Sequence, residues 1–238
     1  MYRENPFFSI IIPTMSEIRA IRGTLDSIAR QSFRDYEVIV CDYKSTDGTI
    51  QIAREYDVDI IDINKPGASV ARNRGALDAE GDYLVFLDAD TSMAPDCLKF
   101  FKIAADSGAL GGFPLVYWDT KDRLTDFFRR YIINPLYYVN SLAGGNAWPS
   151  CCCFYETDAF VKSGGFSENT PIYSSIDLNA KLKNFGKLKF VPNAKCFTSD
   201  RRVRDWGLGS YCITSAYVLL MKLIKDKEPP LDFYEAIR

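Results

Sequence analysis

The chain of 238 residues contains no histidine, and this absence restricts the chemistry open to it. Imidazole is the side chain that proteins use most often as a general base and as a metal ligand. Acid–base and metal-binding roles therefore fall to carboxylates. The seven cysteines show neither CxxC spacing nor another zinc-finger pattern, so a structural zinc site is not expected.

The sequence also has no strong excess of one charge and no long hydrophobic run. Its formal net charge is −2, which gives no electrostatic reason to expect a nucleic-acid partner. The longest apolar stretch, about residues 211–224, is too short and, at Thr214 and Ser215, too polar for a membrane span. Pro13 interrupts the first apolar run, so a signal peptide is not expected, and a reduced, cytoplasmic compartment is favoured.

The first hundred residues alternate between strand-like and helix-like patterns. We expect strands near residues 7–12, 38–41, 58–63 and 83–87. Helices are expected near residues 18–28, with Ser16 as the N-cap, near 49–56 and 69–79, and from Pro95 onward. Strand–helix alternation with short connections and continuous apolar strands predicts an α/β domain with a mostly parallel sheet covered on both faces.

The later part of the chain follows a different pattern. We expect a strand over 109–118, a helix over 122–133 that Pro135 ends, and a helix near 177–184. A glycine-rich loop, "AGGNAWPS", lies between the two helices, and a long segment over 205–227 closes the chain. This half is expected to complete the sheet and to form an acceptor side.

Polar residues follow each of the first four predicted strands, in "IIPTMSE", "CDYKSTDGT", "INKPGAS" and "LDADTS". Ligands of open parallel sheets bind outside the carboxyl ends of the strands. Taken alone, Asp42 and Asp47 are more typical of turns and caps. Asp88 and Asp90 fit a turn or a ligand site equally well, but four such signals on one edge favour a binding site.

The stretches "FSIIIPTMSE", "YEVIVCDYKSTDGT", "GASVARNRGALDAEGDYLVFLDAD" and "SGGFSE" occur in the order and spacing of a known family. Residues 7–205 resemble the family 2 glycosyltransferases, which have the Rossmann-like GT-A fold. The resemblance implies a glycosyltransferase domain over 1–205, with a nucleotide-binding half over about 1–115 and an acceptor half over about 116–205. A C-terminal helical extension would cover 206–238. Such enzymes move a sugar from a nucleotide-diphospho-sugar, UDP more often than GDP, with inversion and with Mn²⁺ or Mg²⁺.

The resemblance also implies a role for individual residues. Asp42 would contact the base, Asp88 would lie near the ribose, and Asp90 would hold the metal. Hard divalent cations prefer carboxylate oxygens and bridge them to phosphate, which agrees with this assignment. The remaining residues on the nucleotide side would be Pro13, Thr14, Glu17, Lys65, Arg72 and Ala89.

The expected catalytic base is where the chain departs from the family. Members usually carry an acidic pair, E-D-x-D-L, at the start of a late helix, but here Ser174 and Ser175 replace the pair and only Asp177 remains. Three explanations stay open. Asp177 or Glu168 acts as the base; the acceptor is a phosphate, such as a lipid phosphate, that needs no base; or the protein is a catalytically silent nucleotide-binding or scaffolding protein. In a purely structural interpretation Asp177 is an acid in the first turn of a helix capped by Ser174 or Ser175.

Two further segments point to the acceptor side, where a glycan or another acceptor would bind. Asn146 and Trp148 stand where the family contacts its acceptor. Arg201 and Arg202, in "CFTSDRRVRDWG", either face a phosphate or form a solvated turn. Cys151, Cys152 and Cys153 have the pattern of a buried strand, for which packing is the default explanation.

The segment "LTDFFRRYIINPLYYVNSL" has an apolar helical face. Leu124, Phe127, Phe128 and Tyr131 recur on that face beside two arginines. This spacing indicates either core packing or a peripheral contact with the inner face of a membrane.

A sugar-nucleotide-forming nucleotidyltransferase is a third class of function. It would need a glycine-rich, basic triphosphate loop near the N-terminus, and "IIPTMSEIRAIRG" does not supply one.

Overall fold

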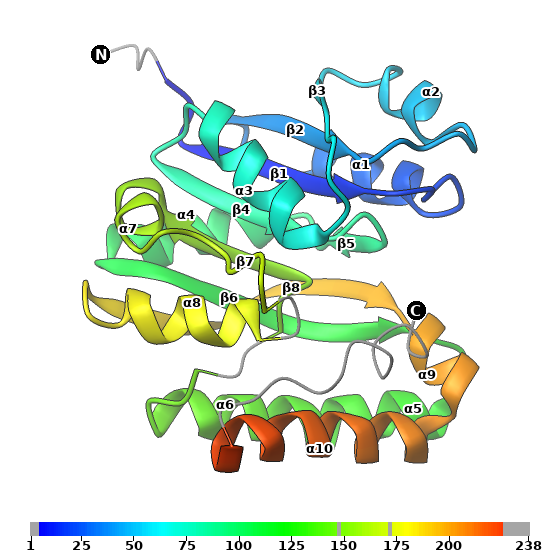
Figure 1. Ribbon diagram of the computed structural model, residues 1–238, viewed down its shortest axis with the longest axis vertical. Helices are drawn as coiled ribbons and strands as arrows, with labels where there is room; N and C mark the ends of the chain where they lie inside the picture. The colour runs from blue at the N-terminus through cyan, green and yellow to red at the C-terminus, as the bar shows by residue number, and fades with distance from the viewer. Residues whose placement is uncertain (1–4, 147–148, 171–172, 226–238) are drawn as a thin grey trace.

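The computed structural model describes residues 5–146, 149–170 and 173–225. Within these residues, eight strands form one sheet in the order β3-β2-β1-β4-β7-β6-β8-β5, with helices on both faces (Figure 1). The α/β class predicted from the sequence is confirmed.

The first half of the sheet is parallel. It consists of β1 (Phe8–Thr14), β2 (Tyr36–Asp42), β3 (Asp59–Asp62) and β4 (Tyr83–Leu87), connected by α1 (Ile21–Ala29), α2 (Thr49–Ala53) and α3 (Ala68–Asp78). The strand order turns at β1, which pairs with β2 on one side and β4 on the other. Such a switch point opens a crevice at the carboxyl ends of the strands.

The second half adds β5 (Thr91–Met93), α4 (Cys97–Asp106), β6 (Ala109–Asp119), β7 (Cys152–Glu156) and β8 (Lys187–Ser199). Strand β7 runs antiparallel to both β4 and β6, so β4 and β6 point the same way. The carboxyl ends of β1, β2, β4 and β6 therefore share one side of the sheet, which we call the carboxyl edge. Strand β8 is parallel to β6 and ends at the same edge.

The remaining helical segments are α5 (Arg123–Phe128), the π-helical η1 (Arg129–Ile133), α6 (Asn134–Leu142), α7 (Thr157–Lys162), α8 (Ser174–Leu182), α9 (Arg201–Trp206) and α10 (Leu208–Lys225). In Figure 1, α10 runs along α5 and α6 at the bottom of the view. Contacts with aromatic rings join this layer to β6, from Tyr137 to Phe113 and from Tyr211 to Trp118. No helix in the described part of the chain is long and apolar enough to cross a membrane.

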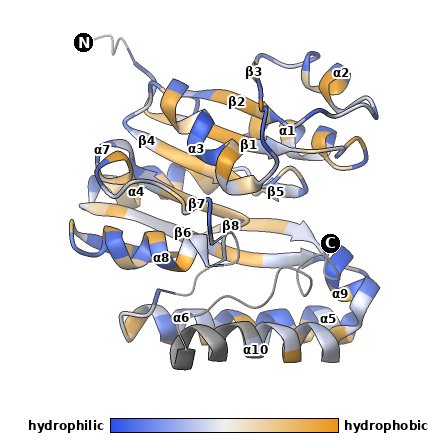
Figure 2. Ribbon diagram, viewed as in Figure 1, coloured by the Kyte–Doolittle hydropathy of each residue, from blue (hydrophilic) through white to orange (hydrophobic). Residues whose placement is uncertain are grey.

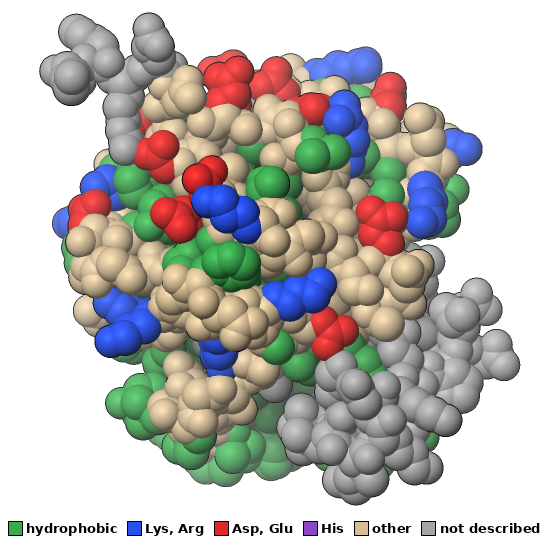
Figure 3. All heavy atoms as spheres, turned by 60° about the vertical axis from the view of Figure 1, so that its left-hand side comes forward, with side chains coloured by type: hydrophobic (Ala, Val, Ile, Leu, Met, Phe, Trp, Pro, Cys, Tyr) green, Lys and Arg blue, Asp and Glu red, His purple; other side chains and the backbone are tan. Residues whose placement is uncertain are grey.

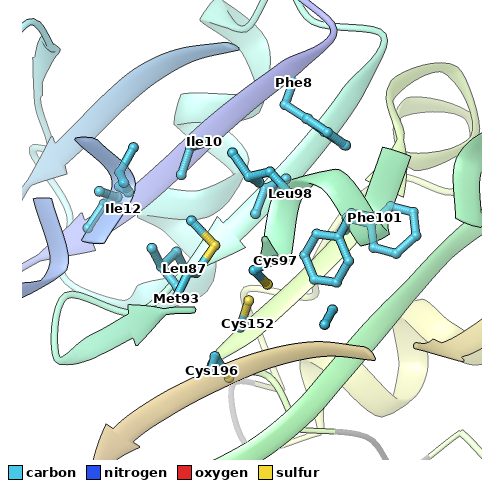
Figure 4. Packing of buried hydrophobic residues seen from close by; sticks show 14 of the residues in the cluster. Phe8, Ile10, Ile12, Leu87, Met93, Cys97, Leu98, Phe101, Cys152 and Cys196 are labelled. Atoms are coloured by element: carbon cyan, nitrogen blue, oxygen red, sulfur yellow. The ribbon is translucent and has the colours of Figure 1, made fainter. Parts of the chain in front are cut away.

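Two hydrophobic clusters lie on the two faces of the sheet. Ile10 and Ile12 of β1 belong to one cluster, whereas Ile11 belongs to the other. Because neighbouring side chains on a strand point to opposite faces, burial of all three explains the continuous apolar run. Hydrophobic positions concentrate along the strands in Figure 2, and Figure 4 shows the first cluster between β1, β4, α4 and β8.

Pro135 does not end its helix, contrary to the sequence prediction. The helical path continues from α5 through η1 into α6, where Pro135 stands in the first turn. In η1 the spacing widens, so that the N–H of Asn134 donates to the carbonyl of Arg129. A proline in a helix's first turn needs no N–H partner, and the helix therefore restarts there.

Two expected helix starts are also wrong. Ser16 is not an N-cap, because it has a φ of 57° in a loop and α1 begins only at Ile21. Helix α8 starts at Ser174 with Tyr173 in the N-cap position, so neither Ser174 nor Ser175 caps it. Asp177 does lie in the first turn of α8.

Candidate functional site

The ends of β1 and β2 bring Thr14 and Asp42 together at the carboxyl edge. The two residues are register partners, and the Thr14 hydroxyl donates to Asp42 Oδ1 at 2.8 Å. Asp42 also accepts from the N–H of Ser45 at 2.9 Å and from its hydroxyl at 2.6 Å. Asp42 is thus a buried, fixed carboxylate, as a base-contacting residue would need to be. Pro13 precedes Thr14 and is half-buried.

The loop after β1 is tied to the start of α2. The N–H of Glu17 donates to the Thr49 hydroxyl at 2.8 Å, and that of Ile18 donates to Asp47 Oδ2 at 3.0 Å. Hydrogen bonds from Thr49 are the main cause of the lowered pKa of Asp47. These bonds leave the Glu17 carboxylate directed to the C-terminal part of the chain, where it contacts Arg201 at 3.3 Å.

The segment Asp88–Asp90 follows β4 and is held through its backbone by three different elements. The N–H of Asp88 donates to the carbonyl of Cys151 at 2.9 Å. The carbonyl of Ala89 accepts from the Thr24 hydroxyl at 2.7 Å, and that of Asp90 accepts from the N–H of Ser199 at 3.1 Å. These bonds satisfy backbone groups of all three residues, and the two carboxylates make separate contacts with arginine side chains.

Arg72 of α3 forms an ion pair with the first of these acids. Its Nη2 lies 2.5 Å from Asp88 Oδ1, and its guanidinium carbon lies 5.4 Å from the centre of the Phe166 ring. Arg72 is buried and its Nε has no hydrogen-bond partner. This unpaired N–H group beside Asp88 is suited to an oxygen-rich ligand that accepts a hydrogen bond.

Asp90 lies close to two other acids, Asp88 and Glu17. Burial, together with the nearby charges of Asp88 and Glu17, raises its pKa from 3.8 to about 6, although Arg201 and Arg202 oppose the shift. Arg201 Nη2 stands 3.6 Å from Asp90 Oδ2 and so bridges Asp90 and Glu17. Arg202 is exposed on the same helix, α9.

These residues fit a divalent cation that is shared with a diphosphate. Within the described residues, no group of three or more acidic or cysteine side chains forms a complete metal cage. Mg²⁺ is usually held by one or two carboxylates and completes its shell with substrate phosphates and water. Asp90 supplies such a carboxylate, and the guanidinium of Arg201 shows that a positive charge is stabilised beside it.

Glu168 is positioned by two residues on the donor side. Lys65 Nζ lies 3.2 Å from Glu168 Oε2, and the Asn73 amide donates to Glu168 Oε1 at 3.3 Å. Asn73 also clamps the backbone of Phe166, donating to its carbonyl and accepting from its N–H, both at 2.9 Å. Lys65 and Glu168 therefore form an ion pair. The sequence predicted Lys65 as a nucleotide-binding residue and Glu168 as a catalytic one.

The acceptor-side residues depend on α8. Asp177 Oδ2 accepts from the Thr170 hydroxyl at 3.4 Å. The amide of Asn179 donates to the carbonyl of Asn146 at 2.9 Å, and Asn179 itself accepts from the buried Tyr155 hydroxyl at 2.7 Å. These two hydrogen bonds fix Asn146 within the glycine-rich loop. Trp148, the other predicted acceptor residue, lies outside the described residues.

Sequence reasoning missed Asn73 and Asn179, whose side chains hold other predicted site residues in position. Asn73 stands in "ARNRG", directly after Arg72, and that adjacency was the available signal. Nothing local distinguishes Asn179, because its partners Tyr155 and Asn146 are far away in the sequence.

Two hollows lie outside this cluster of side chains. One, of about 540 Å³, is at the opposite end of β1 and β4 and is lined mainly by acids and backbone. The other, of about 340 Å³, lies at the carboxyl end of β6 and includes Tyr117, Phe197 and Arg130. On the face drawn in Figure 3, acidic and basic side chains are interspersed, so that face presents no extended field of one sign.

Comparison with known sequences identifies the class of protein. The family model for glycosyl transferase family 2 matches residues 9–154, more than half of the chain. The chain belongs to this family, and the resemblance read from its motifs is confirmed.

Two relatives show how far the similarity extends. The chain is 39% identical over 129 residues to a PGL/p-HBAD biosynthesis glycosyltransferase of Mycobacterium bovis, covering 51% of this chain and 50% of the relative. It is 35% identical over 100 residues to the poly(ribitol-phosphate) beta-N-acetylglucosaminyltransferase TarS of Staphylococcus aureus, covering 39% of this chain and 18% of TarS. The chain thus spans about half the length of the first relative and less of the second.

Solved structures share the fold. The mannosyltransferase PcManGT from Pyrobaculum calidifontis, in complex with GDP-Man and Mn²⁺, has a TM-score of 0.66 at 23% identity, covering 98% of this chain and 68% of that one. S. aureus TarS 1–349 in complex with UDP has a TM-score of 0.62 at 20% identity, covering 81% and 61%. These similarities confirm the GT-A architecture predicted from the sequence.

Proposed function

We propose that the protein is an inverting glycosyltransferase that moves a sugar from a nucleotide-diphospho-sugar to an acceptor hydroxyl or phosphate. The observation that carries this proposal is the convergence of Asp42, Arg72–Asp88 and Asp90–Arg201 on the carboxyl edge. Membership of family 2 supports the same activity. UDP is our first choice of nucleotide, and GDP is the second.

Different side chains would contact different parts of the nucleotide-sugar donor. Asp42, fixed by Thr14 and Ser45, would accept from a ring N–H of the base, and Pro13 would border the nucleoside. Asp88, held by Arg72, is placed to accept from a ribose hydroxyl. Asp90 and Arg201 would then face the diphosphate, whose negative charge needs neutralisation before it can leave.

Asp90 would hold Mn²⁺ or Mg²⁺ together with the phosphates. When bound, the metal supplies the positive charge that stabilises the leaving diphosphate. Arg201, which contacts Glu17 and Asp90, would turn toward a phosphate oxygen, because a guanidinium and a cation compete for the same carboxylate. Glu17 would then remain as a second acid near the cation.

For an acceptor hydroxyl, we propose Glu168 or Asp177 as the base. Glu168 is held by Lys65 and Asn73 next to Arg72, whereas Asp177 lies at the start of α8. The variants Glu168→Gln and Asp177→Asn distinguish the two candidates. Only the variant that has lost the base should show a strongly lowered kcat while it still binds the nucleotide. With a phosphate acceptor neither amide variant lowers kcat strongly.

We further propose that α5, η1 and α6 contact the inner face of a membrane. Leu124, Phe127 and Tyr131 are exposed whereas Phe128 is partly buried, so core packing accounts for only part of that apolar face. Leu136 and Leu142 are 62% and 70% exposed, and residues 134–146 carry no charged side chain. An apolar helical surface of this kind suits the interfacial region of a bilayer, where a lipid-phosphate acceptor would also lie.

Vesicle sedimentation tests the membrane contact. Wild type is expected to sediment with phosphatidylcholine–phosphatidylglycerol vesicles, and a Leu136→Ser/Leu142→Ser variant is expected to stay in the supernatant. Leu77→Ser is the matched control, because Leu77 is 73% exposed but belongs to α3 in the donor half. Equal sedimentation of wild type and both variants, or none by wild type, would contradict the contact.

Release of nucleoside diphosphate tests the activity. We expect release from one member of a panel of UDP- and GDP-sugars, with Mn²⁺ and with glycan or polyprenyl-phosphate acceptors. Asp90→Asn is expected to lower the rate by about 10²-fold or more, as removal of one strong electrostatic contact to a leaving group does. Asp106→Asn, on α4 away from the carboxyl edge, is the control.

The family's acidic pair is absent from "IYSSIDL", and this absence favours a second candidate function. A catalytically silent protein would bind the nucleotide through the same edge and release no diphosphate under any of these conditions. Nucleotide binding without turnover of any tested donor would therefore favour that candidate.

A further inference from the structure

The hollow of about 340 Å³ at the carboxyl end of β6 lies outside the proposed donor contacts. It is lined by the last residues of β6, the loop over 120–122, helix α5, η1 and Phe197 of β8, and we call it the β6 hollow. Figure 1 shows β6 and β8 ending side by side near α5 and α9. The donor contacts proposed above use none of these lining residues.

Two stacked aromatic rings belong to the wall of the β6 hollow. Tyr117 and Phe197 are register partners on β6 and β8, and their ring centres lie 5.5 Å apart at an interplanar angle of 23°. The guanidinium carbon of Arg130 lies 4.6 Å from the centre of the Tyr117 ring. Tyr117 thus has two partners, whereas 38% of Phe197 is exposed. An exposed aromatic ring beside a hollow is suited to a ligand that has an apolar face.

Charged side chains line the rest of the β6 hollow and balance one another. Arg130 Nε donates to both carboxylate oxygens of Asp126 at 2.7 Å. In the described part of the chain the Arg130 side chain makes no other hydrogen bond, so the N–H groups of both Nη atoms remain for a ligand. The charged lining consists of three acids and three bases, which are Asp119, Asp122, Asp126, Lys121, Arg123 and Arg130. Because these charges cancel, the hollow favours neither an anion nor a cation.

These features match a pyranose ring better than an ion. A pyranose has a face of C–H groups that packs on an aromatic ring, and its hydroxyls both donate and accept hydrogen bonds. The guanidinium and the carboxylates supply both kinds of partner. The hollow is near the lower end of the size range of small-ligand sites, roughly 300–1,000 Å³, so it has room for one sugar unit.

The β6 hollow adjoins the backbone of the donor site. Asp119, at the end of β6, is the register partner of Ser199 on β8. The N–H of Ser199 donates to the carbonyl of Asp90 at 3.1 Å. Neighbouring strands lie about 4.8 Å apart, so the hollow begins one strand away from the strand end that contacts Asp90. A glycan that enters the donor site from this side would pass the hollow.

We propose that the β6 hollow binds one pyranose unit of a glycan acceptor. Phe197 packs against the face of the sugar, and Asp126 and Arg130 form hydrogen bonds with its hydroxyls. The unit bound here is a neighbour of the unit that receives the transferred sugar, so acceptors of two or more units are favoured over a monosaccharide. The acceptor role rests on the proposed function, whereas binding of the sugar does not.

Saturation-transfer NMR on the full chain tests binding of the sugar. The probes are the methyl pyranosides of glucose, galactose, mannose and N-acetylglucosamine, without nucleotide or metal. We expect transfer from the protein to the C–H protons of at least one probe. Transfer to none of these probes would overturn the proposal.

Variants locate the bound probe. Phe197→Ala is expected to weaken its binding by about tenfold, and Arg130→Gln by a similar factor. Both side chains are exposed, so their replacement should leave the core intact. Phe185→Ala is the matched control, because Phe185 is 49% exposed but lies before the opposite end of β8. Equal binding by wild type and Phe197→Ala would place the probe elsewhere and overturn the proposal.

Inorganic phosphate distinguishes a sugar site from an anion site. Because the charges of the lining balance, we expect an excess of phosphate, at constant ionic strength, to leave the NMR signal of the probe unchanged. Displacement of the probe by phosphate in wild type, but not in Arg130→Gln, would indicate an anion site and would overturn the assignment to a sugar.

Steady-state kinetics test the acceptor role. The acceptors are the methyl pyranoside that binds and the corresponding methyl disaccharide, used with the donor that the nucleotide-sugar panel identifies. We expect wild type to have a lower KM for the disaccharide, and Phe197→Ala to raise that KM by about tenfold with little change in kcat.

The kinetic result separates this inference from the proposed function. A KM for the disaccharide that Phe197→Ala leaves unchanged would overturn the acceptor role of the β6 hollow. Absence of turnover by wild type with every donor would count against the proposed function instead, while binding of the sugar in the hollow would stand.

Discussion

At the scale of single residues, Asp90 combines the features that a metal-holding acid requires. It is mostly buried, and it lies near two other acids and one arginine that reaches it from α9. In the folded protein without metal its pKa is about 6, compared with the ordinary value of 3.8 for an aspartate. Because the pKa is raised, the stability linked to Asp90 is present below about pH 3.8 and is lost as the pH rises through about 6.

Metal-dependent binding should have the opposite pH dependence, because the cation needs the ionised carboxylate. We expect the Mn²⁺-dependent part of UDP affinity to be constant above pH 7 and to fall below pH 6, approaching about tenfold per pH unit. Titrations between pH 5 and 8, with and without Mn²⁺, measure this part directly. A metal-dependent affinity that is the same at pH 5 and pH 8 would contradict the assignment of Asp90.

Replacement of Arg72 tests the role of its ion-pair partner, Asp88. Replacing it with Met leaves Asp88 partly buried without its ion-pair partner, and we expect a loss of about 3 kcal/mol in the free energy of unfolding. Arg74→Met is the matched control, because Arg74 on the same helix makes an exposed pair with Asp78, and less than about 1 kcal/mol should be lost. Urea unfolding measures both.

A second replacement shows whether the Arg72 effect arises from the pair. Adding Asp88→Asn to Arg72→Met removes the unpaired charge, so part of the lost stability should return. If the double variant is no more stable than Arg72→Met, the loss comes from packing against Phe166 and not from the ion pair.

At the scale of elements, the donor half could be predicted from the sequence much better than the acceptor half. Strand β4 was expected at the residues where it occurs, because continuous apolar runs and short polar connections are local signals. The restart of the helix at Pro135 was not predicted, since it depends on the widened turn of η1 before the proline. A prediction based on the proline alone does not take the preceding widened turn into account.

The clamp between α3 and the loop before α8 is a prediction at this scale. Asn73→Ala removes both hydrogen bonds to the backbone of Phe166 and one to Glu168, so we expect a loss of about 2 kcal/mol and faster amide exchange at Phe166. Glu168→Gln keeps the clamp and should leave stability nearly unchanged. Unfolding and hydrogen exchange that do not distinguish the two variants would argue against Asn73 as a positioning residue.

At the scale of the whole molecule, the site depends on contacts between distant parts of the chain. Arg201 is 184 residues from Glu17, and Asn73 is 93 residues from Phe166. The sequence motifs predicted which acids line the edge, because these acids stand at or directly after the ends of β2 and β4. They did not predict that α9 brings Arg201 to Asp90, since that depends on β8 ending at the same edge as β4.

The central claim is that the carboxyl edge binds a nucleoside diphosphate together with a metal at Asp90. Calorimetric titration tests this claim most directly. UDP and GDP are titrated, with and without Mn²⁺, into wild type, Asp90→Asn and the control Asp106→Asn. We predict Mn²⁺-dependent binding of one nucleotide by wild type and by Asp106→Asn, and its loss in Asp90→Asn. Absence of nucleotide binding by wild type, or binding that Asp90→Asn leaves unchanged, would contradict the account.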